Sequence, residues 1–569
     1  MAKVDTEIKF EEYPFIVPTK VRMCNKFEAL IEDLKECGSL RTAALAIKHF
    51  NKYVEELGTQ LGVIEVLYSI DTTSKRNKNA IDKINELSPL IQNYENQFMA
   101  ILTKSKYRKD LEKEYGKYLL KQYDLALKTF NEKIMDDLYQ ESVLTSKYDE
   151  IMGGAKINFR GEILNLSQLG KYMQDLDRET RKEASLAMDN WLKEHDAELG
   201  ELYDKLVKIR DKIAKTLGYK NFVQLGYDRL GRTDYGPKEV KKYREAIYEV
   251  VTPVTAKLYK DQIKRLGIKN PQFYDYSLMF KDGNPTPKGN PKELVAKAME
   301  MYDDMSKETG EFFHRMIDLH LVDLEAKPGK APGGFCTYFP LYKAPFVFSN
   351  FNGTQGDVDV LTHEMGHAFQ AWMSKDIKVP EYRSPGMETC EIHSMSMEFL
   401  AWPYMEKFFG SEANKYRYSH LADAIKFLPY GITVDEFQHW VYEHVNATHE
   451  ERCAKWREIE RRNCPNRVYD EAPTLESGRY WLRQMHIFSS PFYYIDYTLA
   501  QVVAFEFLAK SRKNRETTWK KYVKLCKCGG KYPYTETLEV NKLNNPFVEG
   551  NLEKSIKPLV KILKEIKID

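Results

Sequence analysis

Long apolar runs, paired cysteines and an excess of one charge are all missing from this chain of 569 residues. No uninterrupted apolar run reaches the roughly 18 residues that a membrane-spanning helix needs. Lys and Arg total 86 against 84 Asp and Glu, so the formal net charge is only +2. Because this balance gives no overall attraction to nucleic acid or to an anionic membrane, we predict neither as a partner. With 30 Gly and 23 Pro, collagen-like and low-complexity chains are also excluded.

The eight cysteines are scattered and form no CxxC pair. A chain of this length has little need of disulfides, so we expect free thiols in a reducing compartment. The N-terminal residues MAKVDTEIKFEEYPF contain neither the apolar segment nor the small-residue cleavage site of a secretory signal. We therefore predict a cytoplasmic protein.

Apolar residues are plentiful, at 43% of the chain, and tyrosine is frequent, with 37 residues. This apolar content and the near-zero net charge exclude a disordered chain. The length favours two or more domains over a single core. The tyrosines are not interleaved with a basic stripe, which argues against stacking on single-stranded nucleic acid.

Helical periodicity dominates residues 20–137, where apolar residues recur three and four apart and Lys and Glu fill the other face. This pattern predicts a bundle of long antiparallel helices with polar outer faces. Turn-forming residues at 71–74 and 86–89 are expected to separate the helices.

The pattern changes near residue 150. Residues 156–166 predict a short β-hairpin that turns at Arg160-Gly161, and a second strand region is expected at residues 333–352. We predict a helical N-terminal domain at residues 1–180 and a second domain, which contains the candidate functional residues, at residues 181–569.

Residues 357–370 read DVDVLTHEMGHAFQ and carry the strongest chemical signal. On a helix, His363 and His367 stand four residues apart and project from one face, so both can bind one metal ion. Glu364 adjoins the first histidine and can act on a water molecule rather than on the metal. The pattern predicts a zinc site of the HExxH type. Gly366 costs about 1 kcal/mol inside a helix, so we expect another segment to cross close to it.

A catalytic zinc site needs a third protein ligand and an open position for water. After a Pro-Gly break, a second helix is expected to bring either Glu391 or, one turn earlier, Glu388 to the metal, and spacing leaves both open. Glu398 and Asp359 are candidates for orienting the ligand imidazoles.

His393 lies two residues after Glu391 and therefore points away from it on a helix. We expect His393 either next to the metal ligands without binding the metal, on the substrate side of the site, or in the core. Further along, Tyr494 and Tyr497 are three residues apart and can share a helical face, whereas Tyr493 turns elsewhere. Aromatic clusters are usually core, so chemistry alone favours packing over a catalytic role for these tyrosines.

Three segments together resemble the thimet-oligopeptidase-like zinc peptidases, most closely their oligoendopeptidase F branch. They are HEMGH, the segment EIHSMSME that begins at Glu391, and HIFSSPFYYIDYTLAQVVAFEF, which begins at His486. The resemblance spans essentially the whole chain and implies Glu391 as the third zinc ligand. It also implies a histidine and paired tyrosines that face the zinc, which correspond to His486, Tyr494 and Tyr497.

The resemblance extends to Gly333 and Gly334, which match the start of an edge strand that lies beside the substrate backbone. One departure concerns residues 489–491, where Ser-Ser-Pro stands in place of the glycine-rich loop of the thimet branch. Loop flexibility known from that branch is therefore not expected to carry over.

The fold that the resemblance implies is mainly α: an elongated multi-helix shell with a small β region near the active site, enclosing a deep substrate channel. We predict a zinc-dependent oligoendopeptidase that binds one Zn2+ per chain and hydrolyses internal bonds of short unfolded peptides. Glu364 is the predicted general base. Tyr497 is the predicted donor to the developing oxyanion, assisted by Tyr494 and His486, and the predicted substrate-binding residues are Gly333, Gly334 and His393.

Two other functions fit the same residues. A zinc exopeptidase of the carboxypeptidase type can also use HExxH, and a helical peptide-binding protein can hold a structural zinc ion. The sequence does not determine the oligomeric state.

Overall fold

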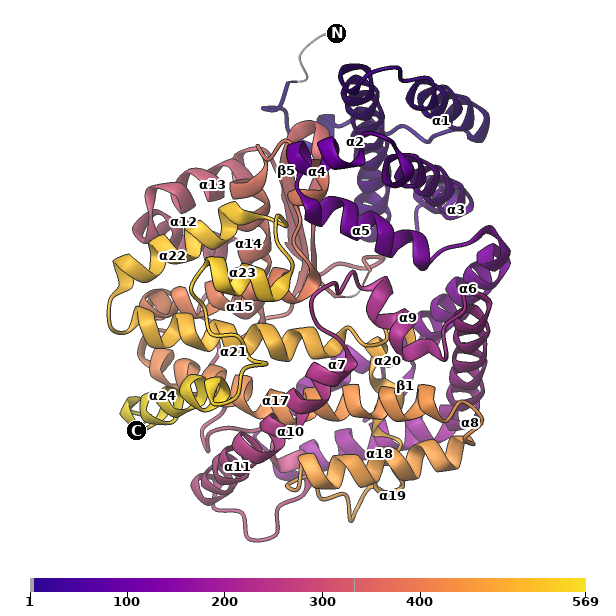
Figure 1. The fold of residues 1–569 in the computed structure, drawn as a ribbon. Helices are drawn as coiled ribbons and strands as arrows, with labels where there is room; N and C mark the ends of the chain where they lie inside the picture. Colours follow the sequence, from indigo (N-terminus) through magenta and orange to yellow (C-terminus); the bar gives the residue numbers. More distant parts are fainter. Residues whose placement is uncertain (1–4, 332, 569) are drawn as a thin grey trace. The chain divides into compact units, whose positions relative to one another are not determined.

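The computed structural model describes residues 5–331 and 333–568. The described chain is mostly helical and contains two small sheets, which confirms the predicted mainly α class (Figure 1). It packs into two compact units, each assembled from three stretches of sequence. Unit 1 comprises the described residues up to Glu132, Thr286–Gly410 and Lys510–Leu543, and unit 2 comprises Lys133–Pro285, Ser411–Ala509 and the described residues from Asn544 onward. The division at residue 180 follows sequence order instead and stays a prediction.

Unit 1 begins with a helical bundle and continues with a sheet flanked by helices. The first stretch contains η1 (Phe10–Glu12), α1 (Lys20–Lys35), α2 (Leu40–Ile70), α3 (Lys75–Lys104), α4 (Arg108–Tyr115) and α5 (Lys117–Lys128). The second contains α12 (Pro291–Met305), α13 (Lys307–Asp318), β3 (Val322–Glu325), β4 (Phe335–Phe339), η4 (Pro340–Tyr342), β5 (Ala344–Phe351), α14 (Gly356–Ser374), η5 (Pro380–Tyr382), α15 (Met387–Leu400), η6 (Trp402–Tyr404) and α16 (Met405–Phe409). The third contains α22 (Arg515–Cys528) and α23 (Tyr534–Val540).

The N-terminal bundle confirms the helical prediction, with one error. The turn at residues 71–74 lies between α2 and α3 as expected. The turn predicted at residues 86–89 is wrong, because Pro89 lies inside α3. Leu87 and Ile91 are buried on either side of it, and the Ser88 hydroxyl donates to the Ile84 carbonyl at 2.9 Å. Burial of these apolar side chains offsets the cost of proline in a helix.

The sheet of unit 1 has the strand order β3-β5-β4, with β3 parallel and β4 antiparallel to β5. Strands β4 and β5 confirm the strand region predicted at residues 333–352. Strand β3 was not predicted, since its four residues carry too little alternation to be distinguished. β4 lies at an edge of the described sheet, and Phe10 of η1 packs against Phe339 and Phe346, with ring centroids 5.7 and 4.6 Å apart.

Unit 2 is built around two long helices, α8 (Arg178–Thr216) and α17 (Ala413–Glu443). Its first stretch contains α6 (Met135–Gly153), β1 (Ile157–Phe159), β2 (Glu162–Leu164), α7 (Leu166–Tyr172), α8 (Arg178–Thr216), α9 (Phe222–Arg229), α10 (Pro237–Val250), α11 (Thr252–Leu266) and η3 (Phe273–Asp275). The rest contains α17 (Ala413–Glu443), α18 (His449–Asn463), α19 (Pro473–Glu476), η8 (Tyr480–Arg483), α20 (Met485–Ser489), α21 (Tyr494–Ser511) and α24 (Asn551–Glu565).

The predicted hairpin is confirmed, because β1 and β2 pair antiparallel across Arg160 and Gly161. Both turn residues have positive φ, 52° and 88°, as a two-residue hairpin turn of this hand requires.

Arginine–carboxylate pairs lie inside unit 2. Arg232 bonds Asp496 at 2.6 Å, and neither side chain is exposed. Arg210 bonds Glu141 at 2.6 Å, again with an arginine that has no exposed surface. Buried charges are tolerated only when paired in this way, so these contacts fix α21 and α8 in place.

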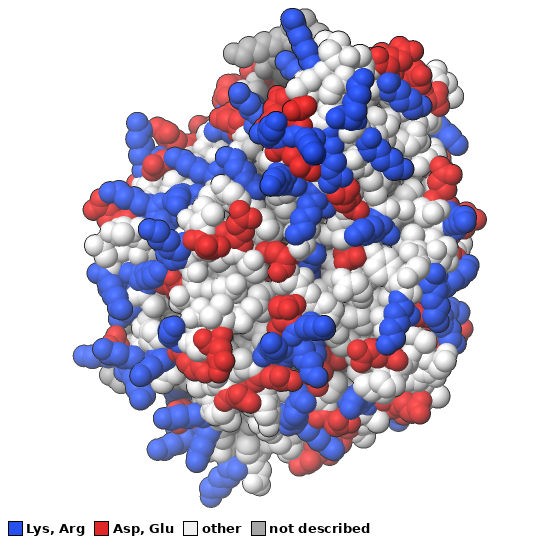
Figure 2. All heavy atoms as spheres, viewed as in Figure 1, with Lys and Arg blue, Asp and Glu red and all other residues white. Residues whose placement is uncertain are grey.

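All eight cysteines are free, as predicted. Among the described residues, no helix is both long enough and apolar enough to span a membrane. Acidic and basic side chains are interspersed on the face shown in Figure 2, in keeping with the nearly balanced charge.

Candidate metal centre and tyrosine cluster

Helices α14 and α15 of unit 1 form where the sequence predicts them and cross closely at Gly366. A Cβ atom at this position would lie 2.7 Å from Ser394 Cα and 2.9 Å from the His393 carbonyl oxygen. Contacts this short are not tolerated, so glycine is what lets the two helices approach. The segment expected to pass close to Gly366 is therefore α15, the helix that carries Glu391.

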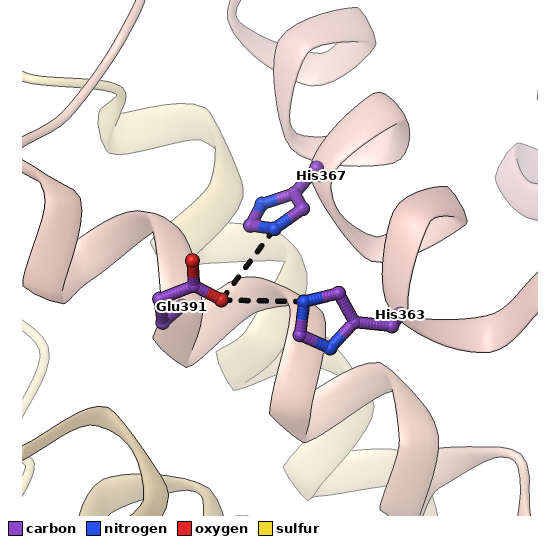
Figure 3. Close-up of side chains that lie close together, drawn as sticks. All are labelled: His363, His367 and Glu391. Carbon is purple, nitrogen blue, oxygen red and sulfur yellow. Dashed lines mark ion pairs between the residues drawn. The ribbon is translucent and has the colours of Figure 1, made fainter. Parts of the chain in front are cut away.

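The three predicted ligands meet at this crossing (Figure 3). The Nε2 atoms of His363 and His367 lie 3.3 and 3.5 Å from one carboxylate oxygen of Glu391. One ligand atom from each residue lies within 4.8 Å of the other two. Glu388, which spacing left as a competitor, is not part of this group among the described residues.

Neighbouring side chains orient two of the three candidate ligands. Glu398 lies 2.6 Å from Nδ1 of His363, which makes it the orienting residue that the sequence suggested. A proton on Nδ1 that is held by Glu398 leaves the lone pair of Nε2 available for a metal ion. The Ser394 hydroxyl donates to Glu391 at 2.9 Å. Asp359, the other candidate, accepts a hydrogen bond from the Gln355 amide at 3.4 Å.

The electrostatics of the group suit a cation. Burial by itself lowers the pKa of His363, but hydrogen bonds to Glu391 and Glu398 outweigh burial and raise this pKa well above its ordinary value. Burial raises the pKa of Glu391, yet the positive charge of His367 and hydrogen bonds from both imidazoles hold it well below the ordinary value. Positive charge is thus favoured where the three donors converge, and the side chains of His363 and His367 remain 23% and 20% exposed.

Glu364 and the start of β4 lie close together. Glu364 is 8% exposed, and a Cβ atom on Gly334 would lie 3.8 Å from its Oε1 atom. Gly333 has a φ of 89°, a conformation that favours glycine. Both glycines are exposed, so the predicted edge strand begins beside the predicted general base.

His393 is fully buried on α15. Its backbone carbonyl accepts a hydrogen bond from Tyr522 at 2.9 Å. Burial, and then the charge of His367, lower the pKa of its imidazole to about 3, so the ring is neutral. The predicted contact of His393 with substrate stays a prediction, and its observed surroundings are those of a core residue.

His486, Tyr494 and Tyr497 gather in unit 2, at the junction of α20 and α21. The ring centroid of His486 lies 4.9 Å from that of Tyr494 and 5.6 Å from that of Tyr497. Tyr493 also packs against Tyr497, at 4.9 Å, although the sequence suggested that it turns elsewhere. We call these four residues the tyrosine cluster.

Two residues that the sequence did not single out hold His486. The Gln484 amide nitrogen lies 3.0 Å from Nδ1 of His486, and the Tyr430 hydroxyl donates to the Gln484 carbonyl oxygen at 2.6 Å. With the amide nitrogen facing Nδ1 and the amide oxygen accepting from Tyr430, Gln484 donates to Nδ1, and the imidazole proton lies on Nε2. No sequence signal links Tyr430 to this pair, since it comes from α17.

The loop between α20 and α21 is fixed by side chains of unit 2. Phe492 has a φ of 67°, which is unusual for a bulky residue. Its carbonyl accepts from Arg232 at 2.7 Å, and its N–H donates to Gln438 at 3.0 Å. These bonds hold the loop that contains Ser490 and Pro491.

A second group of potential metal-binding residues, Asp196, His449 and Glu450, lies in unit 2. Arg479 pairs with both of its carboxylates, at 2.7 Å to Asp196 and closely with Glu450. The guanidinium supplies the positive charge that a metal would otherwise bring, so this group is an ion-pair network.

Two helix-borne histidines and a glutamate from a crossing helix, beside a buried glutamate, are the features of a metallopeptidase. Comparison with sequence families supports this class, because residues 171–555 match peptidase family M3 and residues 10–130 match the peptidase M3 N-terminal domain. The chain belongs to peptidase family M3.

Solved structures agree with this family. Pz peptidase A with an inhibitor is 43% identical, with a TM-score of 0.95 over 98% of this chain and 100% of that one. A Bacillus anthracis protein with a provisional oligoendopeptidase F description is also 43% identical, with a TM-score of 0.90 over 98% and 99%. Oligoendopeptidase F from Enterococcus faecium, 14% identical with a TM-score of 0.62 over 96% and 98%, shares the fold. Among curated proteins, no match was found.

Proposed function

We propose that the chain is a zinc-dependent oligoendopeptidase that cleaves internal bonds of short unfolded peptides. The proposal depends above all on the convergence of His363, His367 and Glu391, whose donor atoms lie within 4.8 Å of one another. Membership of family M3 and the likeness to Pz peptidase A support it. The free cysteines support a reducing compartment, such as the cytoplasm, as the place of action.

Two imidazole nitrogens and one carboxylate oxygen are a donor set that suits catalytic zinc, with a further position open to water. When bound, zinc supplies Lewis acidity that makes water nucleophilic near neutral pH. The chain contributes the orientation of the donors, through Glu398 on His363 and Ser394 on Glu391.

Glu364 is the proposed general base. It adjoins the ligand His363, and its largely buried carboxylate can accept the proton of the attacking water and then deliver it to the leaving amine. Tyr497 is the proposed donor to the oxyanion, and removal of one such donor typically costs about 10²–10³ in rate. Tyr494 and the Nε2–H of His486 are proposed to hold the peptide.

Substitution of Glu364 by Gln tests the mechanism. The variant keeps the shape of the side chain but cannot accept a proton, so it should retain zinc and lose nearly all peptide hydrolysis. Zinc content by elemental analysis and turnover of a peptide library, with and without chelator, give both readouts. Substantial residual turnover by the zinc-loaded variant would contradict the general-base role.

Peptides blocked at both ends test the position of cleavage. An endopeptidase should cut such peptides internally, and mass spectrometry of the products locates the bond. Intact blocked peptides alongside cleaved free ones would indicate an exopeptidase. Stoichiometric zinc without any hydrolysis would indicate a binding protein.

A further inference from the structure

A cavity of about 240 Å³ lies within unit 2, outside the tyrosine cluster. Aromatic residues, among them Tyr274, Tyr469 and Tyr480, line it together with Arg467 and Arg483. The volume is smaller than the roughly 300–1,000 Å³ of most sites for drug-sized ligands, so the cavity is suited to a single side chain or chain terminus. Walls of rings and guanidinium groups favour an anion on a short stem.

The two arginines differ in whether a carboxylate of the described chain already pairs with them. Arg467 bonds the fully buried carboxylate of Glu460 at 2.8 Å, and that carboxylate also accepts from Arg457 and Tyr469 at 3.2 and 3.0 Å. Arg483 lies over the ring of Tyr480, 5.0 Å from its centroid. Within the described chain, Arg483 has no hydrogen bond or ion pair, so its N–H groups are available to a ligand.

A second polar group of the cavity also lacks a partner within the described chain. Ser185 is 1% exposed, and its hydroxyl has no hydrogen-bond partner there. A buried polar group left unpaired costs about 1–3 kcal/mol, so a ligand that satisfies it is favoured. The local potential is positive as well. Burial raises the pKa of the Tyr480 phenol, but the charges of Arg483 and Arg467 outweigh burial and hold it below its ordinary value.

Aromatic contacts connect the cavity to the tyrosine cluster. Tyr480, in the cavity wall, packs edge-on against Tyr430 with centroids 6.0 Å apart. Tyr430 in turn packs against Tyr494 at 5.9 Å. The cavity therefore lies two aromatic contacts from residues proposed to hold the peptide.

We propose that this cavity is a recognition pocket for a carboxylate of the peptide, bound by Arg483 and by the hydroxyl of Ser185. A guanidinium matches a carboxylate with two parallel hydrogen bonds, and the aromatic walls cover its aliphatic stem. The carboxylate comes from an acidic side chain or from the C-terminus. This inference rests on the proposed function only in taking peptides as the ligands.

Small probes test the pocket without any turnover. N-acetylglutamate α-amide carries a side-chain carboxylate, N-acetylalanine carries a terminal one, and N-acetylglutamine α-amide carries neither. Calorimetric titration of the zinc-loaded chain should show at least one of the two acids binding about tenfold or more tighter than the neutral probe. Which acid is preferred identifies the source of the carboxylate. Equal binding of all three probes would overturn the proposal.

Matched variants test whether the acid probes bind at Arg483. Arg483→Met should abolish the preference for the acid and leave the neutral probe unaffected, whereas Arg483→Lys should recover part of it. Lys208→Met removes an exposed charge of the same unit outside the cavity lining and should change nothing. Thermal unfolding of each variant checks that it folds. A preference that survives Arg483→Met in a folded chain would contradict the assignment.

Different experimental results would contradict the pocket proposal and the proposed function. A chain that cleaves neutral peptides yet shows no carboxylate preference is a peptidase without this pocket. A chain that binds the acid probe through Arg483 yet cleaves no peptide has the pocket without the activity.

Discussion

The affinity of the candidate metal centre for zinc depends on single residues, and Glu398 offers a direct test of this. It lies 2.6 Å from Nδ1 of His363, where it fixes the ring and increases the basicity of Nε2. Glu398→Ala should weaken zinc binding about 10–100-fold, measured by competition with a chromophoric chelator. Glu308→Ala, which removes an exposed glutamate of α13, should leave the affinity unchanged. Equal affinities for the two variants would contradict the role of Glu398.

The protonated nitrogen of His486 gives a second prediction. Gln484 donates to Nδ1 at 3.0 Å, which keeps the proton on Nε2. In Gln484→Glu, a carboxylate would accept from Nδ1, so the proton should move there and the Nε2–H donor should be lost. Nitrogen-15 spectra of labelled histidine, recorded where the imidazole is neutral and assigned with His486→Gln, report this exchange directly.

Measurements of kcat and KM distinguish a change of the His486 tautomer from a general loss of structure. Gln484→Glu should raise KM more than it lowers kcat, because a donor proposed to hold the peptide is lost. Tyr430→Phe removes the hydroxyl that donates to the Gln484 oxygen and should keep the Nε2 proton with a smaller change in KM. An unchanged tautomer in Gln484→Glu is the outcome that rules out the positioning role.

At the scale of helices, the crossing of α14 and α15 depends on one missing side chain. In Gly366→Ala, the new Cβ atom would meet the backbone of α15 at 2.7 and 2.9 Å, and overpacking of this kind costs about 1–3 kcal/mol. The midpoint of urea unfolding should fall. The zinc content should fall with it, because α15 carries Glu391.

Gly58 provides the matched control, since it lies inside α2 and a Cβ atom added there would meet no described atom within 4 Å. Gly58→Ala should be neutral or stabilise the chain by up to about 1 kcal/mol. If both alanine variants behave alike, close helix packing is not what selects glycine at position 366.

The elements also show what the sequence could and could not predict. Local spacing predicts α14, its histidine pair and the close crossing at Gly366, because all three depend on helical geometry over a few residues. The prediction failed at Pro89, where the tertiary burial of Leu87 and Ile91 outweighs a local turn signal. Contacts such as Tyr430 with Gln484 join residues 54 apart in sequence, so no local pattern reveals them.

For the whole molecule, the interleaving of the chain explains why domain organisation is hard to derive from sequence. Each unit takes its residues from three separate stretches, and one passage between the units, at residues 509 and 510, lies inside helix α21. No break in the helical pattern marks that passage. The candidate metal ligands belong to unit 1 and the tyrosine cluster to unit 2, so each group can be tested by variants within its own unit.

Stability against pH is a whole-molecule property to which the ion-pair network of His449 contributes. Partial burial lowers the pKa of His449, but hydrogen bonds to Asp196 and Cys453 and the charge of Asp196 outweigh it and raise the pKa from 6.5 to about 9. A histidine with a raised folded-state pKa stabilises the fold fully below its unfolded value of about 6.5. That stabilisation is lost as the pH rises through about 9.

His449→Gln should therefore lower the melting temperature more at pH 6 than at pH 10, as measured by calorimetry of parent and variant. For domains of 150–250 residues, each kcal/mol corresponds to about 2–4 °C. His444→Gln is the control, because His444 is exposed and its ring bonds the Trp440 carbonyl rather than a carboxylate. Its effect should be the same at both pH values. A His449→Gln effect that does not shrink between pH 6 and pH 10 would show that the imidazolium–Asp196 pair contributes no charge-dependent stability, and that packing alone holds α18 at this point.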